Sequence, residues 1–433
     1  MDTPITDHTE FGAIDIGKNV NWLRIFRGLA LEPVCEPLKV RTTQAGLAVV
    51  TAQIDARLAH CDRFYLALEP TGIYHENWTR ALADRYRAHI AGTQPPPLDF
   101  RFLNPYRVKL KRQQLAGRNT KTDPLDLIAM AHCLRDGVGY PAWYPTGVEL
   151  QFQEWIAAYY QAARAQRLLA RTILTQLDRL WPGALVDGTQ FRRAHPELEP
   201  PIPIVQSHPL ERERLRTLLD YCPNPYAALD LGQDGLMALL RQHIGRCGPA
   251  TAQRIRQVLL TAVLPAPEAA AVYTQRLQAA WQRYHDLEAH LSDLQTQAEA
   301  LVPQSPAAVL DTIPGVSAFL AARYLAAVGH HRRFPDPDAI WRLAGFDVLQ
   351  DDSGDRRRAG HISKRGDPTF RDTLYLIGWH TSRQCPPIQQ ARQRALDRGL
   401  GDVGATLHAA HKANRLCGRL LYDQSPYDPQ RHR

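Results

Sequence analysis

The sequence of 433 residues lacks a long hydrophobic run, since no stretch reaches the roughly 18 consecutive apolar residues that suggest a membrane span. Its N-terminus, MDTPITDHTEF, has acids where a secretory signal peptide carries bases. The seven cysteines are scattered, without the close pairs of a zinc cluster or a disulfide framework. We therefore expect a soluble, cytoplasmic protein with reduced cysteines and no membrane contact.

Acidic residues are missing from 101–121, although that stretch contains seven bases. The seven are Arg101, Arg107, Lys109, Lys111, Arg112, Arg118 and Lys121. A second basic cluster, which includes Arg358, Lys364 and Arg365, surrounds the phrase GHISKRGDP at 360–368. With a net charge of +8, these two clusters favour a phosphate backbone as partner, and a solvated surface face is the alternative for each.

The apolar pattern of the first part predicts an α/β domain. Runs at 11–16 and 21–26, joined by Gly17-Lys18-Asn19, predict a β-hairpin, and a third strand is expected in VCEPLKVRT. A helix at 45–59, the strand FYLALE, a helix at about 74–89 and a helix from Asp123 to Arg135 follow. Strands first, then strands and helices in alternation, indicate a mixed sheet.

Beyond Pro145 the pattern changes to long helices. Apolar residues recur with four-three spacing from Phe152 to Leu180 and from Tyr273 to Leu301, which predicts two coiled-coil segments. These segments can pair with each other or with copies in another chain. Residues 182–265 between them are Pro-rich at first and then helical, with no recognisable motif. We expect domains at 1–148, 149–304 (with 182–265 as an insertion) and 305–433.

The C-terminal part begins with LDTIPGVSAFLAARYLAAVG. This predicts a tight turn at Ile313-Pro314-Gly315-Val316, followed by a helix of small residues that ends at Gly329. The segment resembles the helix-hairpin-helix module, in which the backbone N–H groups around such a glycine contact a DNA phosphate. A packing corner between two helices is the alternative for Gly315.

Four carboxylates form a candidate site for a divalent cation. Asp15 interrupts an apolar strand on the face of Phe11 and Ala13, and Glu69 ends the strand FYLALE. Asp123 and Asp126 share one face of a helix start. Oxygen ligands of this kind suit Mg²⁺ or Mn²⁺.

Each acid also has a structural alternative. Asp123-Pro124 with Asp126 is typical of a helix N-terminus, Asp15 can accept hydrogen bonds from the hairpin, and Glu69 can pair with a base. The combination of two strand acids, a helical acid pair and the basic stretch just before it favours a site that handles phosphate.

Several phrases together resemble a known family. They are AIDIGKN, LALEPTGIYHENW, NPYRVK with GRNTKTDPLDLIAMA, IPGVSAFLAARYLAAVG, and RRF, LAGF and GHISKRGDPTFR. They look like the DEDD-type insertion-sequence transposases, and the match covers most of the chain in order, apart from 182–265. The resemblance implies an α/β plus α chain: a RuvC-like, RNase H-fold domain, a coiled-coil middle and a mainly helical C-terminal transposase domain.

Position by position, the resemblance places the four family acids on Asp15, Glu69, Asp123 and Asp126, and the family serine on Ser363. It implies a recombinase that excises and inserts its own element, acts on donor and target DNA, and is guided by a bridge RNA. Pro124, Leu127 and the QPPP loop depart from the family pattern without removing an acid. We expect a homo-oligomer, a dimer or tetramer, held by the coiled coils.

Two other functions are compatible with the same residues. A hydrolytic nuclease or junction resolvase uses four acids and Mg²⁺ to activate water and has no need of Ser363. A DNA-binding or architectural protein would use only the glycine turn and the basic clusters. Glycine-rich nucleotide loops are absent from the sequence, which argues against an ATP-driven transposition helper.

Overall fold

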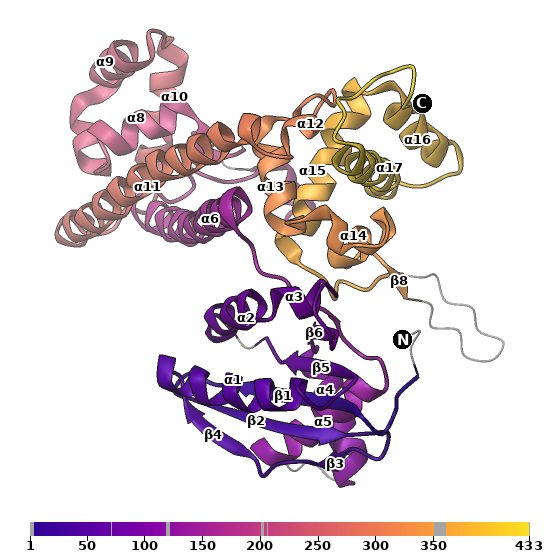
Figure 1. Ribbon diagram of the computed structural model, residues 1–433. Coiled ribbons are helices and arrows are strands. Elements are labelled where there is room, and N and C mark those ends of the chain that lie inside the picture. Colours follow the sequence, from indigo (N-terminus) through magenta and orange to yellow (C-terminus); the bar gives the residue numbers. More distant parts are fainter. Residues whose placement is uncertain are drawn as a thin grey trace. The chain divides into compact units, whose positions relative to one another are not determined.

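The computed structural model describes residues 4–70, 72–117, 122–200, 203–205, 207–349 and 361–432. The chain divides into two compact units, Met1–Thr146 and Gly147–Arg433 (Figure 1). The second unit contains both the helical middle and the C-terminal region. Within the described ranges, none of the helices combines the length and the apolar character needed to span a bilayer.

A seven-stranded mixed sheet forms the centre of the first unit. Its strands are β1 (Thr9–Ile16), β2 (Val20–Arg27), β3 (Glu32–Pro33), β4 (Leu38–Arg41), β5 (Arg63–Leu68), β6 (Leu98–Phe102) and β7 (Tyr140–Pro141). β1 pairs antiparallel with β2 and parallel with β5, and β5 pairs parallel with β6. The predicted hairpin, third strand and mixed sheet are confirmed, whereas β6 was not identified in the sequence.

Helices cover both faces of this sheet. They are α1 (Gln44–Leu58), α2 (Tyr74–Arg85), α3 (Arg87–Ile90), α4 (Pro105–Ala116) and α5 (Asp123–Arg135). Ile14 and Ile16 of β1 share a core with residues of α1 and α2, whereas Phe11 and Ala13 share a second core with residues of α4 and α5. The alternation along β1, which the sequence predicted, therefore divides its side chains between the two helical layers.

Two long helices, α6 (Gly147–Leu180) and α11 (Pro267–Leu301), run side by side in the second unit (Figure 1). Seam residues from both helices, such as Ile173, Leu177 and Leu277, are buried in one core. The two seams thus meet within one chain. Pairing with another copy stays a prediction.

The insertion between these helices is helical, as expected. It contains α7 (Gly188–Ala194), the 3₁₀ turn η1 (Pro209–Glu211), α8 (Glu213–Tyr221), α9 (Pro225–Ile244) and α10 (Pro249–Thr261). Leu218, Leu240 and Ile255 join the core that also receives residues of α6 and α11. This shared core anchors the insertion on the two long helices.

The C-terminal region is mainly helical with one short two-stranded sheet. Its elements are η2 (Val302–Gln304), α12 (Ala308–Asp311), α13 (Ala318–Val328), η3 (His331–Arg333), α14 (Pro337–Leu343), β8 (Val348–Leu349), β9 (His361–Ile362), α15 (Pro368–Gln384), α16 (Pro386–Asp397) and α17 (Asp402–Asp423). The predicted small-residue helix is α13, and it ends at Gly329 as expected. α13 is buried along most of its length because its alanines allow α15 and α6 to approach.

α15 and α17 pack closely at a glycine. A Cβ placed on Gly378 of α15 would lie 2.6 Å from both the Cβ and the backbone nitrogen of Ala410 on α17. Gly404 of α17 is different, because a Cβ there would meet the Leu400 side chain, with its nearest atom 3.3 Å away.

We expect Gly378→Ala to lower the free energy of unfolding by about 1–3 kcal/mol, because overpacking against backbone cannot relax cheaply. The matched change Gly404→Ala should be neutral or stabilising by up to about 1 kcal/mol, since alanine favours a helix. Denaturant unfolding of both variants measures the difference, and equal stability of the two would contradict the close contact.

Candidate functional site

The two strand acids lie at the same end of neighbouring parallel strands. Ile14 and Leu68 are partners in the β1–β5 register, so Asp15 and Glu69 each follow at the next position. By the alternation of side chains along a strand, Asp15 belongs to the same face of the sheet as Phe11 and Ala13. Glu69 belongs to the same face as Tyr65 and Ala67, and this is the face that packs against α5. Both acids are half-buried and have interaction partners in the structure.

The two helical acids have different environments. α5 begins at Asp123 with Thr122 in the cap position, so Asp123 is in the first turn instead of being the N-cap, and it is exposed. Asp126 is buried, at 5% exposure, on the side of α5 that faces the sheet. Its carboxylate accepts a hydrogen bond from the guanidinium of Arg112, which is itself largely buried.

A divalent cation fits this donor set in part. The acids supply the oxygen ligands that Mg²⁺ or Mn²⁺ prefers, and three of them belong to one side of the sheet. The side chains as positioned do not close into a ligand shell: among the described residues, no three His, Cys, Asp or Glu side chains form a group that could hold a metal ion. Arg112 instead serves as the counter-ion of Asp126.

The basic stretch before α5 forms helix α4, and its bases differ in exposure. Arg107 and Lys109 are exposed. Lys111 donates a 2.7 Å hydrogen bond to Asp136. Burial by itself would raise the pKa of the Asp136 carboxyl, but hydrogen bonds from Lys111 and Arg135 lower it below its usual value.

The predicted phosphate contact of this stretch stays a prediction, and the structure divides its bases into paired and exposed ones. Arg112 is paired with Asp126 of α5 and Lys111 with Asp136, the residue that follows α5, because α4 and α5 pack against each other. Arg107 and Lys109 remain the exposed bases of this helix. Arg118 and Lys121 lie outside the described residues, as does Arg358 of the second basic cluster.

Gly315 has a packing role in the structure. Its φ of +94° favours glycine, and a Cβ there would lie 2.8 Å from the carbonyl of His380 on α15. The absent side chain thus lets the turn before α13 contact the backbone of α15. This observation supports the packing-corner alternative for Gly315 and leaves a phosphate contact untested.

Ser363 is half-buried in a turn directly after β9. Its hydroxyl donates to Asp347 Oδ1 at 2.5 Å, with a weaker 3.3 Å contact to the carbonyl oxygen of Gly345. It also accepts a 3.2 Å hydrogen bond from the backbone N–H of Arg365. The side chains of Lys364 and Arg365 beside it are exposed.

Gly366, three residues after Ser363, lies against a second segment of the backbone. A Cβ on Gly366 would lie 2.2 Å from the backbone nitrogen of Gly345 and from the carbonyl oxygen of Leu343. Gly366 therefore allows two chain segments to touch. Gly360, the other glycine of the phrase, lies outside the described residues.

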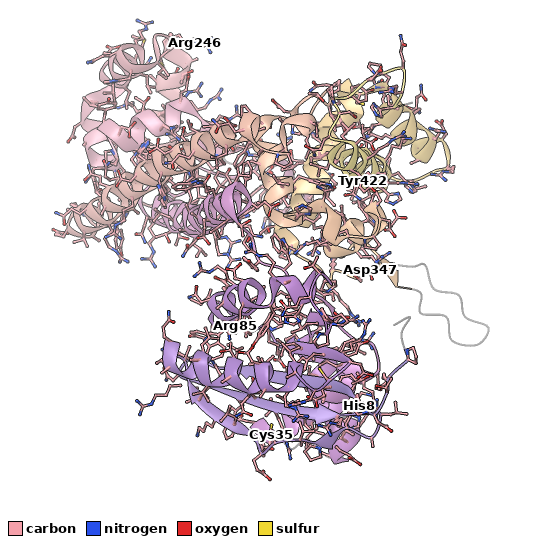
Figure 2. The ribbon with its side chains drawn as sticks, in the orientation of Figure 1. His8, Cys35, Arg85, Arg246, Asp347 and Tyr422 are labelled. Atoms are coloured by element: carbon pink, nitrogen blue, oxygen red, sulfur yellow. The ribbon has the colours of Figure 1, made fainter. Side chains whose placement is uncertain are left out.

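Asp347 is the residue that sequence reasoning missed. It follows the buried phrase LAGF and is half-buried, and it also accepts the backbone N–H of Ser363 at the carbonyl oxygen, 2.8 Å away. Its side chain is visible at the edge of the C-terminal region (Figure 2). An acid at the end of an apolar run was the signal that singled out Glu69, and the same rule would have found Asp347 after LAGF.

This chain is similar to a transposase family and to two proteins whose names refer to transposition or an insertion element. Residues 307–394, which include Gly315, Asp347 and Ser363, match the model of the transposase IS116/IS110/IS902 family. A probable family 20 transposase of Pseudomonas aeruginosa is 29% identical over 204 residues, which cover 46% of this chain and 58% of that protein. An uncharacterized 43.6 kDa protein of insertion element IS110 from Streptomyces coelicolor is 24% identical over 247 residues, 55% of this chain and 58% of that protein. The chain therefore aligns with little more than half the length of these curated relatives, and the matched family segment lies wholly in its second unit.

Proposed function

We propose that this protein is an IS110-type DNA transposase, which cuts and rejoins DNA strands to excise and insert a mobile element. The observation that carries the proposal is the match of 307–394 to the IS116/IS110/IS902 transposase family. The two relatives with transposase and insertion-element names support it. Its partners are donor and target DNA, a bridge RNA as guide, and further copies of the chain that form a dimer or tetramer.

The N-terminal unit supplies the acids in this proposal. A mixed sheet with helices on both faces supports a RuvC-like, RNase H-fold domain. Asp15, Glu69, Asp123 and Asp126 would hold Mg²⁺ or Mn²⁺, which would add positive charge beside a phosphate under attack. Asp126 must exchange Arg112 for the cation, because its carboxylate is already paired.

The C-terminal unit supplies the nucleophile. Ser363 Oγ would attack phosphorus, its proton would pass to the Asp347 carboxylate, and the bond from phosphorus to the deoxyribose oxygen would break. The leaving oxygen takes up a proton, and the new phosphoserine bond retains the energy for rejoining. Exposed Lys364 and Arg365 would stabilise the charge on the phosphate oxygens.

One observation favours a hydrolytic nuclease or junction resolvase as the second candidate. The hydroxyl of Ser363 is half-buried and already engaged with Asp347 and with the N–H of Arg365, as in a turn that needs no chemistry. In that case the acids alone would direct water to the phosphodiester, and no covalent intermediate would form.

The acid site is tested with Asp15→Asn. Asp15 lies near the end of β1, and the substitution replaces the proposed carboxylate ligand of the cation by a neutral amide. We expect cleavage of a duplex carrying the element's own end to fall on the order of a hundredfold or more. We also expect the rise in melting temperature on adding Mn²⁺ to disappear. Glu36→Gln, an exposed acid between β3 and β4, is the control. Wild-type cleavage and an unchanged Mn²⁺ response in Asp15→Asn would rule out this site.

A second test compares the exposed bases of α4 with its largely buried base, Arg112. Arg107→Gln with Lys109→Gln should weaken binding to duplexes of any sequence and reduce the slope of log affinity against log salt by about 2, because exposed bases displace counterions from phosphate. Arg112→Gln should instead lower the free energy of unfolding by about 3–5 kcal/mol, because it leaves Asp126 buried and unpaired. An unchanged salt slope in the first variant, or an unchanged stability in the second, contradicts the division.

The serine step predicts a covalent protein–DNA adduct that survives a denaturing gel. Wild-type protein incubated with the element-end duplex and its guide RNA should give the adduct, and Ser363→Ala should not. Peptide mapping of the adduct identifies the attached residue. Cleaved ends without an adduct favour the hydrolytic nuclease, and an adduct on another residue, such as Ser353 in the preceding segment, would show that Ser363 is not the nucleophile.

A further inference from the structure

The helical insertion contains a cavity of about 550 Å³ in a segment where the sequence showed no motif. Its walls come from three places: the chain at Pro203–Val205 and Ser207, the start of α8, and the connection from α9 into α10. Ile204 at its wall belongs to the core of the insertion and Ile244 packs against that core, so part of the wall is apolar.

Arginines dominate the charge around this cavity. The wall contains Arg212, Arg214, Arg246 and Arg254, against a single carboxylate, that of Glu213. The sequence has no acid between Asp234 and Glu268, so every charged side chain on the α9–α10 side of the cavity is a base. Figure 2 shows Arg246 at the surface of the insertion.

Three of these arginines are available to a ligand. Arg212 is held at the wall by donating to the backbone carbonyl and hydroxyl oxygens of Ser207, at 3.0 and 2.9 Å. The guanidinium groups of Arg214, Arg246 and Arg254 have no hydrogen bond or ion pair with any of the residues that the structure describes. Unlike Arg112, they form no ion pair with a carboxylate among the described residues.

Contacts within the α9–α10 connection hold the backbone around Arg246 in place. Gly245 ends α9 in the left-handed conformation, and Arg241 Nε donates a 2.9 Å hydrogen bond to the carbonyl oxygen of Cys247. Gly248 and Thr251, at the start of α10, also border the cavity. The positive end of this helix adds to the attraction that the guanidinium groups exert on an anion.

Guanidinium groups that converge from separate elements suit phosphate better than other anions, because the planar fork donates two parallel hydrogen bonds to phosphate oxygens. A cavity of several hundred Å³ accommodates a ligand of several rings, which is more than one phosphate requires. A length of sugar–phosphate backbone meets both conditions.

We infer that this cavity binds the phosphodiester backbone of a nucleic acid, as a contact separate from the acids of the N-terminal unit and from Ser363. The three unpartnered arginines neutralise backbone phosphates, and the contact positions the nucleic acid without reading its bases. DNA and RNA share this chemistry, and the test separates them.

The test compares the full-length chain with the triple variant Arg214→Gln, Arg246→Gln and Arg254→Gln. Fluorescence anisotropy across a salt series measures binding to a duplex DNA of about 30 base pairs and to an RNA hairpin of similar size. If the cavity binds backbone phosphates, the slope of log affinity against log salt should fall by about 2–3 in the variant. At about 0.1 M salt we expect at least a tenfold loss of affinity. The matched control is Arg192→Gln with Arg193→Gln, exposed bases of α7 outside the cavity wall.

A loss with DNA alone, with RNA alone or with both supports the inference and identifies the source of the backbone. Unchanged affinity and slope for both probes, or an equal loss in the α7 control, would overturn it. Displacement of the probes by millimolar inorganic phosphate would reveal a small-anion site and would also overturn it. Melting temperatures confirm that the variants are folded, and since the assay needs no strand cleavage, its result does not depend on the transposase chemistry.

Discussion

The parallel pairing of β1 with β5 is the constraint on which the N-terminal unit depends. Both strands are buried on both faces, so an acid within them needs a counter-charge. Glu10 shows the rule: it is 1% exposed, and its carboxylate accepts hydrogen bonds from Arg57 and Arg27. Asp15 and Glu69 sit where the buried strands end, which is where a carboxylate can meet an external cation.

The use of arginine differs between the interior and the surface. Arg112 faces Asp126, and buried Arg323 donates to Asp372 and to Tyr160, joining α13 to α15 and α6. These guanidinium groups stabilise helix packing and contribute little to an external field, because a carboxylate cancels each charge. Exposed bases that can attract a polyanion include those on α4, those beside Ser363 and those around the cavity of the insertion. Net charge alone does not reveal this division.

In the C-terminal region, two short chain segments meet at their backbones. Gly345 and Gly366 are in contact, Leu343 accepts the N–H of Asp367 at 2.8 Å, and this brings Asp347 to Ser363. Any side chain at either glycine would separate the segments. The same contact is compatible with a catalytic serine and with a structural turn.

The sequence by itself determined the local features of this protein: the hairpin, the alternation of Asp15 with its apolar neighbours, the two long helices and the helix after Gly315. These follow from periodicity and turn residues, which act between near neighbours in the chain. Only the tertiary structure decided that Arg112 belongs to Asp126, that Asp347 reaches Ser363, and that arginines from α8 and from the α9–α10 connection line one cavity. Those contacts join residues far apart in sequence, and their pairing depends on how helices and strands pack, which no local pattern encodes.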